Sequence, residues 1–171
     1  PVQQIIQLSD SLLAIREVVN GGKTRIFDPL TGKYTGLAFD NVMQRTNSIW
    51  RGFSGGITSV YCNRQLLFSK KTTDLDLVSF RNRRVFMYRD AQGWHLVNFK
   101  GEPITPVVYD DLMPNNDYQL PMLKAGKKGL LSMDGKELIA PQYDEIVAGT
   151  SGFFQVKKGN LWGIIDRQGV V

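Results

Sequence analysis

The chain has 171 residues, of which 42% are hydrophobic and 22% are charged, and its formal net charge is +5. These proportions are ordinary for a globular domain, and a small positive charge spread along the chain gives no reason to expect a nucleic-acid partner. A single cysteine, Cys62, excludes an intramolecular disulfide. No apolar run reaches the roughly 20 residues that a transmembrane helix needs, so we expect no transmembrane segment.

Short apolar segments alternate with glycine-containing turns along the chain. Residues 11–19 are the best candidate for a helix, but the glycines at 21 and 22 fit a strand and a hairpin turn better. Further turns are predicted at residues 28–32, 90–93, 124–127, 133–135 and 158–160. Near the end, residues 154–157 alternate apolar and polar side chains, which is the pattern of a half-buried strand.

An internal repeat organises the second half of the chain. The segment GEPITPVVYDDL at residues 101–112 returns as GKELIAPQYDEI at residues 135–146, a shift from 101 to 135 of 34 residues. Trp94 and Trp162 are separated by twice this spacing, with Lys128 midway. The first half has the same period more faintly, and agreement at several landmarks indicates duplication.

Each repeat reads as three strands joined by tight turns. We therefore predict an all-β fold of about five three-stranded antiparallel units of roughly 34 residues, together forming a single domain over residues 1–171. The expected units are residues 11–48, 49–83, 84–117, 118–151, and 152–171 together with 1–10.

The two ends of the chain are expected to meet. The last unit stops where its third strand should begin, and the segment around Ile5 resembles the residues that come after a third strand in other units. An N-terminal strand that completes the last unit would close a propeller-like ring and leave only short, protected sheet edges. The alternative is an open or superhelical β-repeat array.

Residues 161–169, LWGIIDRQG, together with residues 141–146, PQYDEI, resemble the WG-repeat (KWG-type) β-repeat proteins of bacteria. The resemblance is good over about residues 85–171 and weak over 11–84, and only Trp162-Gly163 keeps the full signature dipeptide. It implies a repeat scaffold, sometimes exported, and no catalytic residues. Since Pro1 is not an initiator residue, we expect a processed piece, and an extracytoplasmic location (periplasm or cell surface) is favoured over the cytoplasm.

Few residues offer chemistry. His95 is the single histidine, and without a second histidine or a nearby cysteine it favours a structural role over a zinc site or a triad. Cys62 reads as a small buried residue. No phosphate loop, paired CxxC motif or ligand cluster is present in the sequence, so no cofactor and no metal are expected.

Four aspartates recur at one repeat position: Asp40, Asp76, Asp110 and Asp144. Their repetition favours a structural role, in which the carboxylate binds local backbone at a turn. The alternatives are carboxylates that converge on a cation or a sugar, or a pair that hydrolyses a glycoside as in a hydrolase-like propeller.

Candidate binding residues lie where the repeat is least regular. Trp50 stands in such a region, and the segment before residue 85 holds three arginines that can bind carboxylate or phosphate groups: Arg81, Arg83 and Arg84. We therefore expect a non-enzymatic binding scaffold, with a protein or peptide as its partner. A glycan- or cell-envelope-binding module is the alternative, and it requires exposed aromatic side chains.

Overall fold

The computed structural model describes residues 2–17, 21–72, 74–80, 83–113, 119–149, 152–166 and 168–170. The chain divides into two compact units, one formed by Pro1–Leu75 with Phe99–Gly101 and the other by Asp76–Asn98 with Glu102–Val171. The described residues contain strands and turns and no helix, and therefore no helix that is long and apolar enough to cross a membrane.

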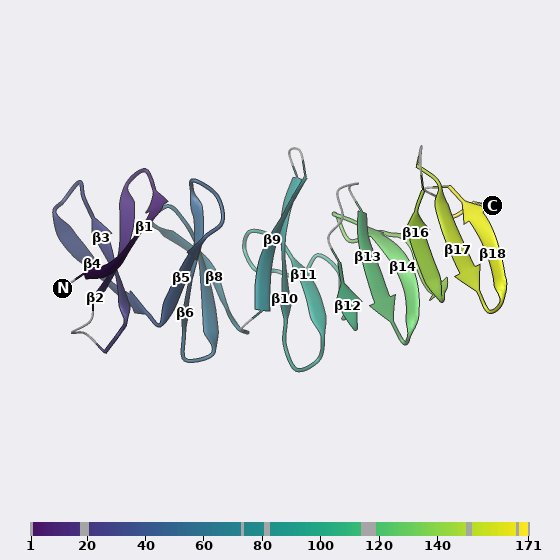
Figure 1. Cartoon of the computed structure of the whole chain (residues 1–171), viewed down its shortest axis with the longest axis horizontal. Coiled ribbons are helices and arrows are strands. Elements are labelled where there is room, and N and C mark those ends of the chain that lie inside the picture. Colours follow the sequence, from purple (N-terminus) through teal and green to yellow (C-terminus); the bar gives the residue numbers. More distant parts are fainter. Residues whose placement is uncertain are drawn as a thin grey trace. The chain divides into compact units, whose positions relative to one another are not determined.

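The first unit holds two four-stranded sheets (Figure 1). The first sheet has the order β1 (Val2–Ser9), β2 (Leu12–Glu17), β3 (Thr24–Asp28) and β4 (Lys33–Phe39). The second has the order β5 (Asn41–Gln44), β6 (Ile49–Ser54), β7 (Ile57–Cys62) and β8 (Gln65–Lys71). Side chains from both sheets form one core cluster around Ile26, Phe39 and Trp50.

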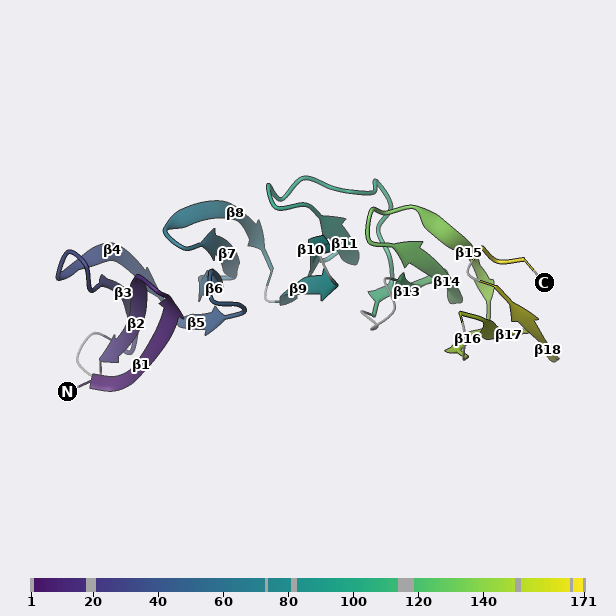
Figure 2. The same ribbon diagram turned by 90° about the horizontal axis from the view of Figure 1, so that it is seen from above.

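The second unit holds the other three sheets, with β9 beginning at the end of the first unit. These sheets have the orders β9 (Asp74–Phe80), β10 (Arg83–Arg89), β11 (Trp94–Val97); β12 (Asp111–Leu112), β13 (Gln119–Lys124), β14 (Lys127–Ser132), β15 (Glu137–Tyr143); and β16 (Glu145–Ala148), β17 (Phe154–Lys158), β18 (Leu161–Ile165). Figure 2 shows β15 beside β14. Trp94, Leu112 and Leu120 belong to one core cluster, and Leu130, Phe154 and Ile165 to another.

The structure confirms the predicted all-β chain of five small antiparallel sheets, and it adds a fourth strand to three of them. The 34-residue period is visible in the backbone. The same turn bond forms three times, from the N–H of residues 98, 132 and 166 to the carbonyl of residues 102, 136 and 170, at 3.0, 2.9 and 2.9 Å. The side chain of Asn98, Ser132 or Asp166 accepts the return bond each time. One local turn, repeated, therefore sets the spacing.

The expected position of the N-terminal strand needs a correction. Residues near Ile5 do not complete the last sheet; they form β1, which pairs with β2 so that Ile5 lies opposite Ile15. The reason is local, because the turn at Ser9 and Ser11 brings the chain directly back and a short hairpin loop costs little closure entropy. The first sheet thus spans residues 2–39, where a unit at 11–48 was expected.

Candidate binding surface

Trp50 is a core residue, and its predicted place on a binding surface is wrong. Its side chain is 0% exposed, stacks on Tyr61 at 4.1 Å between ring centroids and meets the edge of Phe39. The indole Nε1–H donates a 2.8 Å hydrogen bond to the carbonyl of Asn63. Because its single polar atom is satisfied inside the protein, the ring has no face left for a ligand.

The predicted arginine patch is only partly described. Arg81 lies outside the described residues, whereas Arg83 and Arg84 are exposed at the start of β10. Arg83 forms an ion pair with Asp134, with 3.6 Å between Nη1 and Oδ2. Hydrogen bonding from Ser132, with the charge of Arg83, holds the pKa of Asp134 below its usual range. A role of this patch in partner binding stays a prediction.

Two of the four recurring aspartates, Asp40 and Asp144, bind hairpin turns through their carboxylates. In both units an aspartate carboxylate accepts a backbone N–H from a hairpin turn 15 residues later: Gly55 to Asp40 at 3.2 Å, and Gly159 to Asp144 at 2.7 Å. Lys127 also donates to Asp144, and this bond and the one from Gly159 lower the pKa of Asp144. Asp76 instead accepts from the next residue, as Asp111 does. These bonds agree with the structural interpretation.

His95 also lies among local partners. Its ring stacks on Tyr88 at 4.6 Å, and Nε2 lies 3.0 Å from Oδ1 of Asp90. Burial acts to raise the pKa of Asp90, but the hydrogen bonds from His95 and from backbone N–H groups together lower it. Cys62 is half-buried. Within the described part of the chain, no group of three histidine, cysteine or acidic side chains is placed to hold a metal ion.

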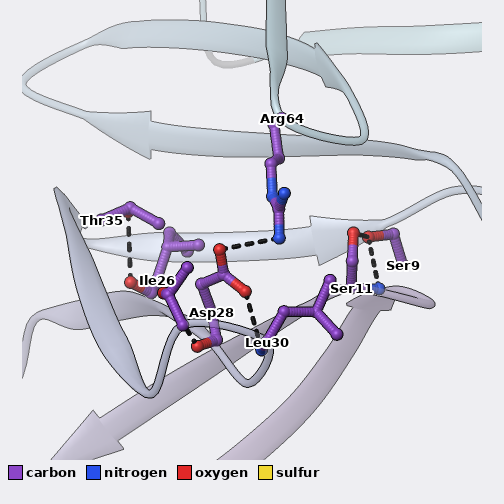
Figure 3. Close-up of polar contacts among 8 residues, drawn as sticks. Ser9, Ser11, Ile26, Asp28, Leu30, Thr35 and Arg64 are labelled. Atoms are coloured by element: carbon purple, nitrogen blue, oxygen red, sulfur yellow. Dashed lines mark hydrogen bonds and ion pairs between the residues drawn. The ribbon is translucent and has the colours of Figure 1, made fainter.

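A polar contact joins the two sheets of the first unit (Figure 3). Asp28, at the end of β3, is nearly buried and accepts the N–H of Leu30 at 2.9 Å. Its other oxygen lies 2.7 Å from Nη2 of Arg64, which lies in the turn between β7 and β8. This pair fixes the β7–β8 turn against the first sheet, so we assign it to stability.

Three exposed apolar side chains of the second unit lie on β18. We call Leu161, Trp162 and Ile164 the β18 surface. Trp162 is 55% exposed, in contrast to the buried Trp94 at the same repeat position. β18 is the last strand of its sheet (Figure 1) and pairs only with β17 among the described strands. An open strand edge beside exposed apolar side chains is a surface that other chains can bind.

A hollow of about 180 Å³ adjoins the β18 surface. Tyr143, Val156 and Lys158 line it together with the residues of β18. The ammonium of Lys157 lies 5.6 Å from the ring centroid of Trp162, close enough for a cation–π contact. The surface therefore combines an aromatic platform, aliphatic side chains and positive charge.

A second hollow, of about 240 Å³, lies in the first unit over β5, β6 and β7. Its lining includes the buried side chains of Val42 and Thr58, and Arg51 donates to the sulfur of Met43 at 3.3 Å across it.

Trp162 stands at the repeat position of Trp94 in the sequence, but the two tryptophans differ in burial. Trp94 is buried in a core cluster with Leu112 and Leu120 of the following sheet, and its backbone pairs with Tyr109 by bonds of 2.7 and 3.0 Å. Whether the tryptophan at this repeat position is exposed therefore depends on which side chains pack against it, and not on its place in the repeat.

Comparisons with known proteins place one repeat in a family. Residues 129–162 match the family model described as WG containing repeat. No curated protein matches the chain. Similar solved structures include KlHsv2 with loop 6CD replaced by a Gly-Ser linker (11% identity, TM-score 0.46, 100% of this chain and 64% of that one) and Kluyveromyces lactis Hsv2p (11%, 0.43, 99% and 62%).

The chain therefore spans less than two thirds of either Hsv2 chain that it matches. The WD40 beta propeller domain of Doa1 is similar at 12% identity and a TM-score of 0.37, over 96% of this chain and 82% of that one. With TM-scores below 0.5, none of these structures bears on the function of this chain.

Proposed function

We propose that this chain, of which residues 129–162 match the WG containing repeat, is a non-enzymatic binding scaffold whose ligand is a protein or peptide held at the β18 surface. The observation that carries the proposal is the exposure of Trp162 and Ile164 on one face of β18, with Leu161 exposed on the other face. Tryptophan is enriched among the residues that contribute most to protein–protein binding. Contiguous exposed apolar surface of this kind marks interaction sites.

The roles of the acidic residues support the non-enzymatic part of the proposal. Glycoside hydrolysis needs two carboxyl groups about 5 to 10 Å apart in an open site. Asp40 and Asp144 instead accept hydrogen bonds from hairpin glycines, and the Asp144 carboxylate is also paired with Lys127. Carboxylates held in repeated structural bonds are poorly suited to the distinct acid and base roles of a catalytic pair.

Selection from a displayed library of random linear peptides tests the proposal. We expect enriched peptides with apolar and aromatic residues, bound about tenfold or more weakly by Trp162→Ala, which corresponds to about 1.4 kcal/mol. Ile57→Ala, which removes an exposed apolar side chain from the first unit, is the matched control and should leave affinity unchanged. Failure to enrich any peptide, or enriched peptides that bind Trp162→Ala as well as the wild type, would contradict the proposal.

A glycan ligand is the second candidate, and the hollow beside Trp162 favours it. An exposed indole with Tyr143 and Lys158 at its side offers a stacking surface with polar groups at the rim. Titration with soluble cell-wall glycan fragments, monitored by tryptophan fluorescence, separates the two candidates. Saturable quenching that Trp162→Phe reduces, without enrichment of any peptide, would assign the surface to glycans.

The arginine patch is a second surface with its own test. Arg83→Glu combined with Arg84→Glu should weaken binding of an acidic partner without unfolding, because both side chains are exposed. Thermal unfolding by circular dichroism checks the fold of the double variant. If the two substitutions leave binding unchanged, the arginine patch has no role in binding the partner.

A further inference from the structure

The hollow of the first unit is built by an interior sheet of the chain. Its volume is about 240 Å³, and six described residues of β5, β6 and β7 line it: Asn41, Val42, Met43, Arg51, Phe53 and Thr58. Among these described lining residues Arg51 is the single charged one, and none is acidic. The strands belong to the second of the five sheets, which has other sheets before and after it in the sequence.

The sheet of β12–β15 contains a counterpart of this hollow. The N–H of Asp40 bonds to the carbonyl of Phe53, and the N–H of Asp110 bonds to the carbonyl of Leu123, both at 2.9 Å. Both hairpins continue antiparallel from these bonds, so their residues correspond step by step. The corresponding pairs are Asn41 and Asp111, Met43 and Met113, Arg51 and Pro121, and Phe53 and Leu123.

The counterpart stays open although another sheet packs against the same face. Met113 and Leu130 lie on either side of Pro121 in register, and opposed residues of an antiparallel sheet share a face. Leu130 shares a core cluster with Phe154 of the following sheet. Met113 is nevertheless 42% exposed, as Met43 is 41% exposed. Exposure is therefore a property of this repeat position, which a sheet on the same face does not remove.

The two places differ in charge. The residue that follows the recurring aspartate is acidic in the last two sheets, as Asp111 and Glu145, whereas in the first unit it is the neutral Asn41. Arg51 stands where the later sheet has Pro121. The hollow of the first unit thus has an amide and a guanidinium in place of a carboxylate and a proline ring, and this exchange favours an anionic ligand.

The polar groups of the hollow have donors to offer an anion. Asn41 accepts the N–H of Val42 with Oδ1 at 2.9 Å, and this bond does not use the two N–H groups of Nδ2. Arg51 donates from Nη2 to the sulfur of Met43 at 3.3 Å. A thioether is a weak acceptor, so a carboxylate is a stronger partner for the same donor. Arg51 has other contacts as well, and its five N–H groups serve several partners at once.

We infer that this hollow binds a carboxylate joined to an aromatic group, as in the C-terminal residue of a peptide or in a small aromatic acid. Arg51 and Asn41 bind the carboxylate, and the half-buried ring of Phe53 and the thioether of Met43 contact the aromatic group. Pockets for drug-sized ligands begin at about 300 Å³, so a hollow of about 240 Å³ suits a single residue. The site belongs to the first unit and is independent of the β18 surface.

N-acetylphenylalanine and N-acetylphenylalaninamide are the probes, because they differ only in the carboxylate. Each is titrated into the chain carrying ¹³C-labelled methionine methyl groups, and the NMR signals of Met43 and Met113 are assigned by substituting each with leucine. We expect the acid to shift the signal of Met43 saturably and to leave that of Met113, its repeat counterpart, in place. The amide should bind about tenfold or more weakly.

Asn41→Asp is the variant that tests the charge argument. It sets a second carboxylate beside that of the ligand, so affinity for the acid should fall about tenfold or more. Its melting temperature should stay near that of the wild type, because Asp111 accepts the N–H of Leu112 at 2.9 Å in the same local bond. Arg51→Met should lower affinity similarly. Arg64→Met, which removes the same charge from the β7–β8 turn, is the matched control and should leave affinity unchanged.

Three results would overturn the inference: no saturable shift of Met43, equal affinities for the acid and the amide, or a folded Asn41→Asp variant that binds the acid as the wild type does. A short peptide ending in phenylalanine that binds more tightly than 3-phenylpropionate would identify peptide C-termini as the ligand, and the reverse order would identify small aromatic acids. Trp162→Ala should change none of these affinities, so this site and the β18 surface are tested separately.

Discussion

The same chemical change at two tryptophans should have very different costs. Trp50→Ala removes a side chain that is fully buried in the first unit, and Trp162→Ala removes one that is more than half exposed in the second. Truncating a buried aromatic residue to alanine costs about 3 to 5 kcal/mol. The stacked and edge-on ring contacts of Trp50, together with its hydrogen bond to Asn63, place it at the upper end of that range.

For Trp162→Ala we expect about 1 kcal/mol or less, because most of the indole is already in contact with water. Small domains are stable by only about 5 to 15 kcal/mol, so Trp50→Ala should remove a large fraction of the stability of the first unit. Urea unfolding monitored by far-UV circular dichroism measures both variants without relying on tryptophan emission. A Trp162→Ala variant as unstable as Trp50→Ala would refute the assignment of Trp50 to the core and Trp162 to the surface.

Three further predictions concern the fold. Gly52→Ala should destabilise the first unit by about 1 to 3 kcal/mol, because a Cβ there would lie 2.5 Å from the ring of Phe39; urea unfolding that matches the wild type would contradict this close approach. Asp28→Ala should cost about 1 to 3 kcal/mol and Arg64→Ala about 1 or less, because the carboxylate is nearly buried and the guanidinium half exposed; a larger loss for Arg64→Ala would reverse the assignment. Stability should fall as the pH is lowered through and below about 4, the ordinary pKa of an unfolded aspartate. The folded state lowers the pKa of several aspartates, and such groups stabilise the protein above the unfolded pKa and lose that contribution as they are protonated; melting temperatures that stay constant from pH 5 to 2 would argue against the contacts of Asp90, Asp134 and Asp144.

The repeat and the strand class could be predicted from the sequence because both depend on local signals. Each turn near residues 98–102, 132–136 and 166–170 is closed by bonds within five residues, so its sequence carries the spacing. The fourth strands of the sheets were not predicted, and the reason is physical. β15 contains Ala140 and Pro141 and does not alternate simply between apolar and polar residues. It forms a strand because it pairs with the edge of β14.

The position of the candidate site could not be predicted, because burial depends on residues that are distant in sequence. Trp50 lies in the least repeat-like region of the sequence, which predicted a place on a binding surface. It is buried because Phe39 and Tyr61, from two other strands, close over it. The residues adjacent to Trp50 in the sequence do not indicate these contacts, because Phe39 and Tyr61 lie 11 residues away on either side.

Trp94, Lys128 and Trp162 occupy one repeat position, yet each has a different environment. Trp94 is buried in a side-chain cluster, Lys128 pairs with Tyr143 of β15, and Trp162 is more than half exposed. In a chain of similar sheets, each repeat offers the same kind of face to the next one. Trp94 shares a core cluster with Leu112 and Leu120, and Leu130 shares one with Phe154 and Ile165, so burial along these strands comes from the side chains of the following sheet.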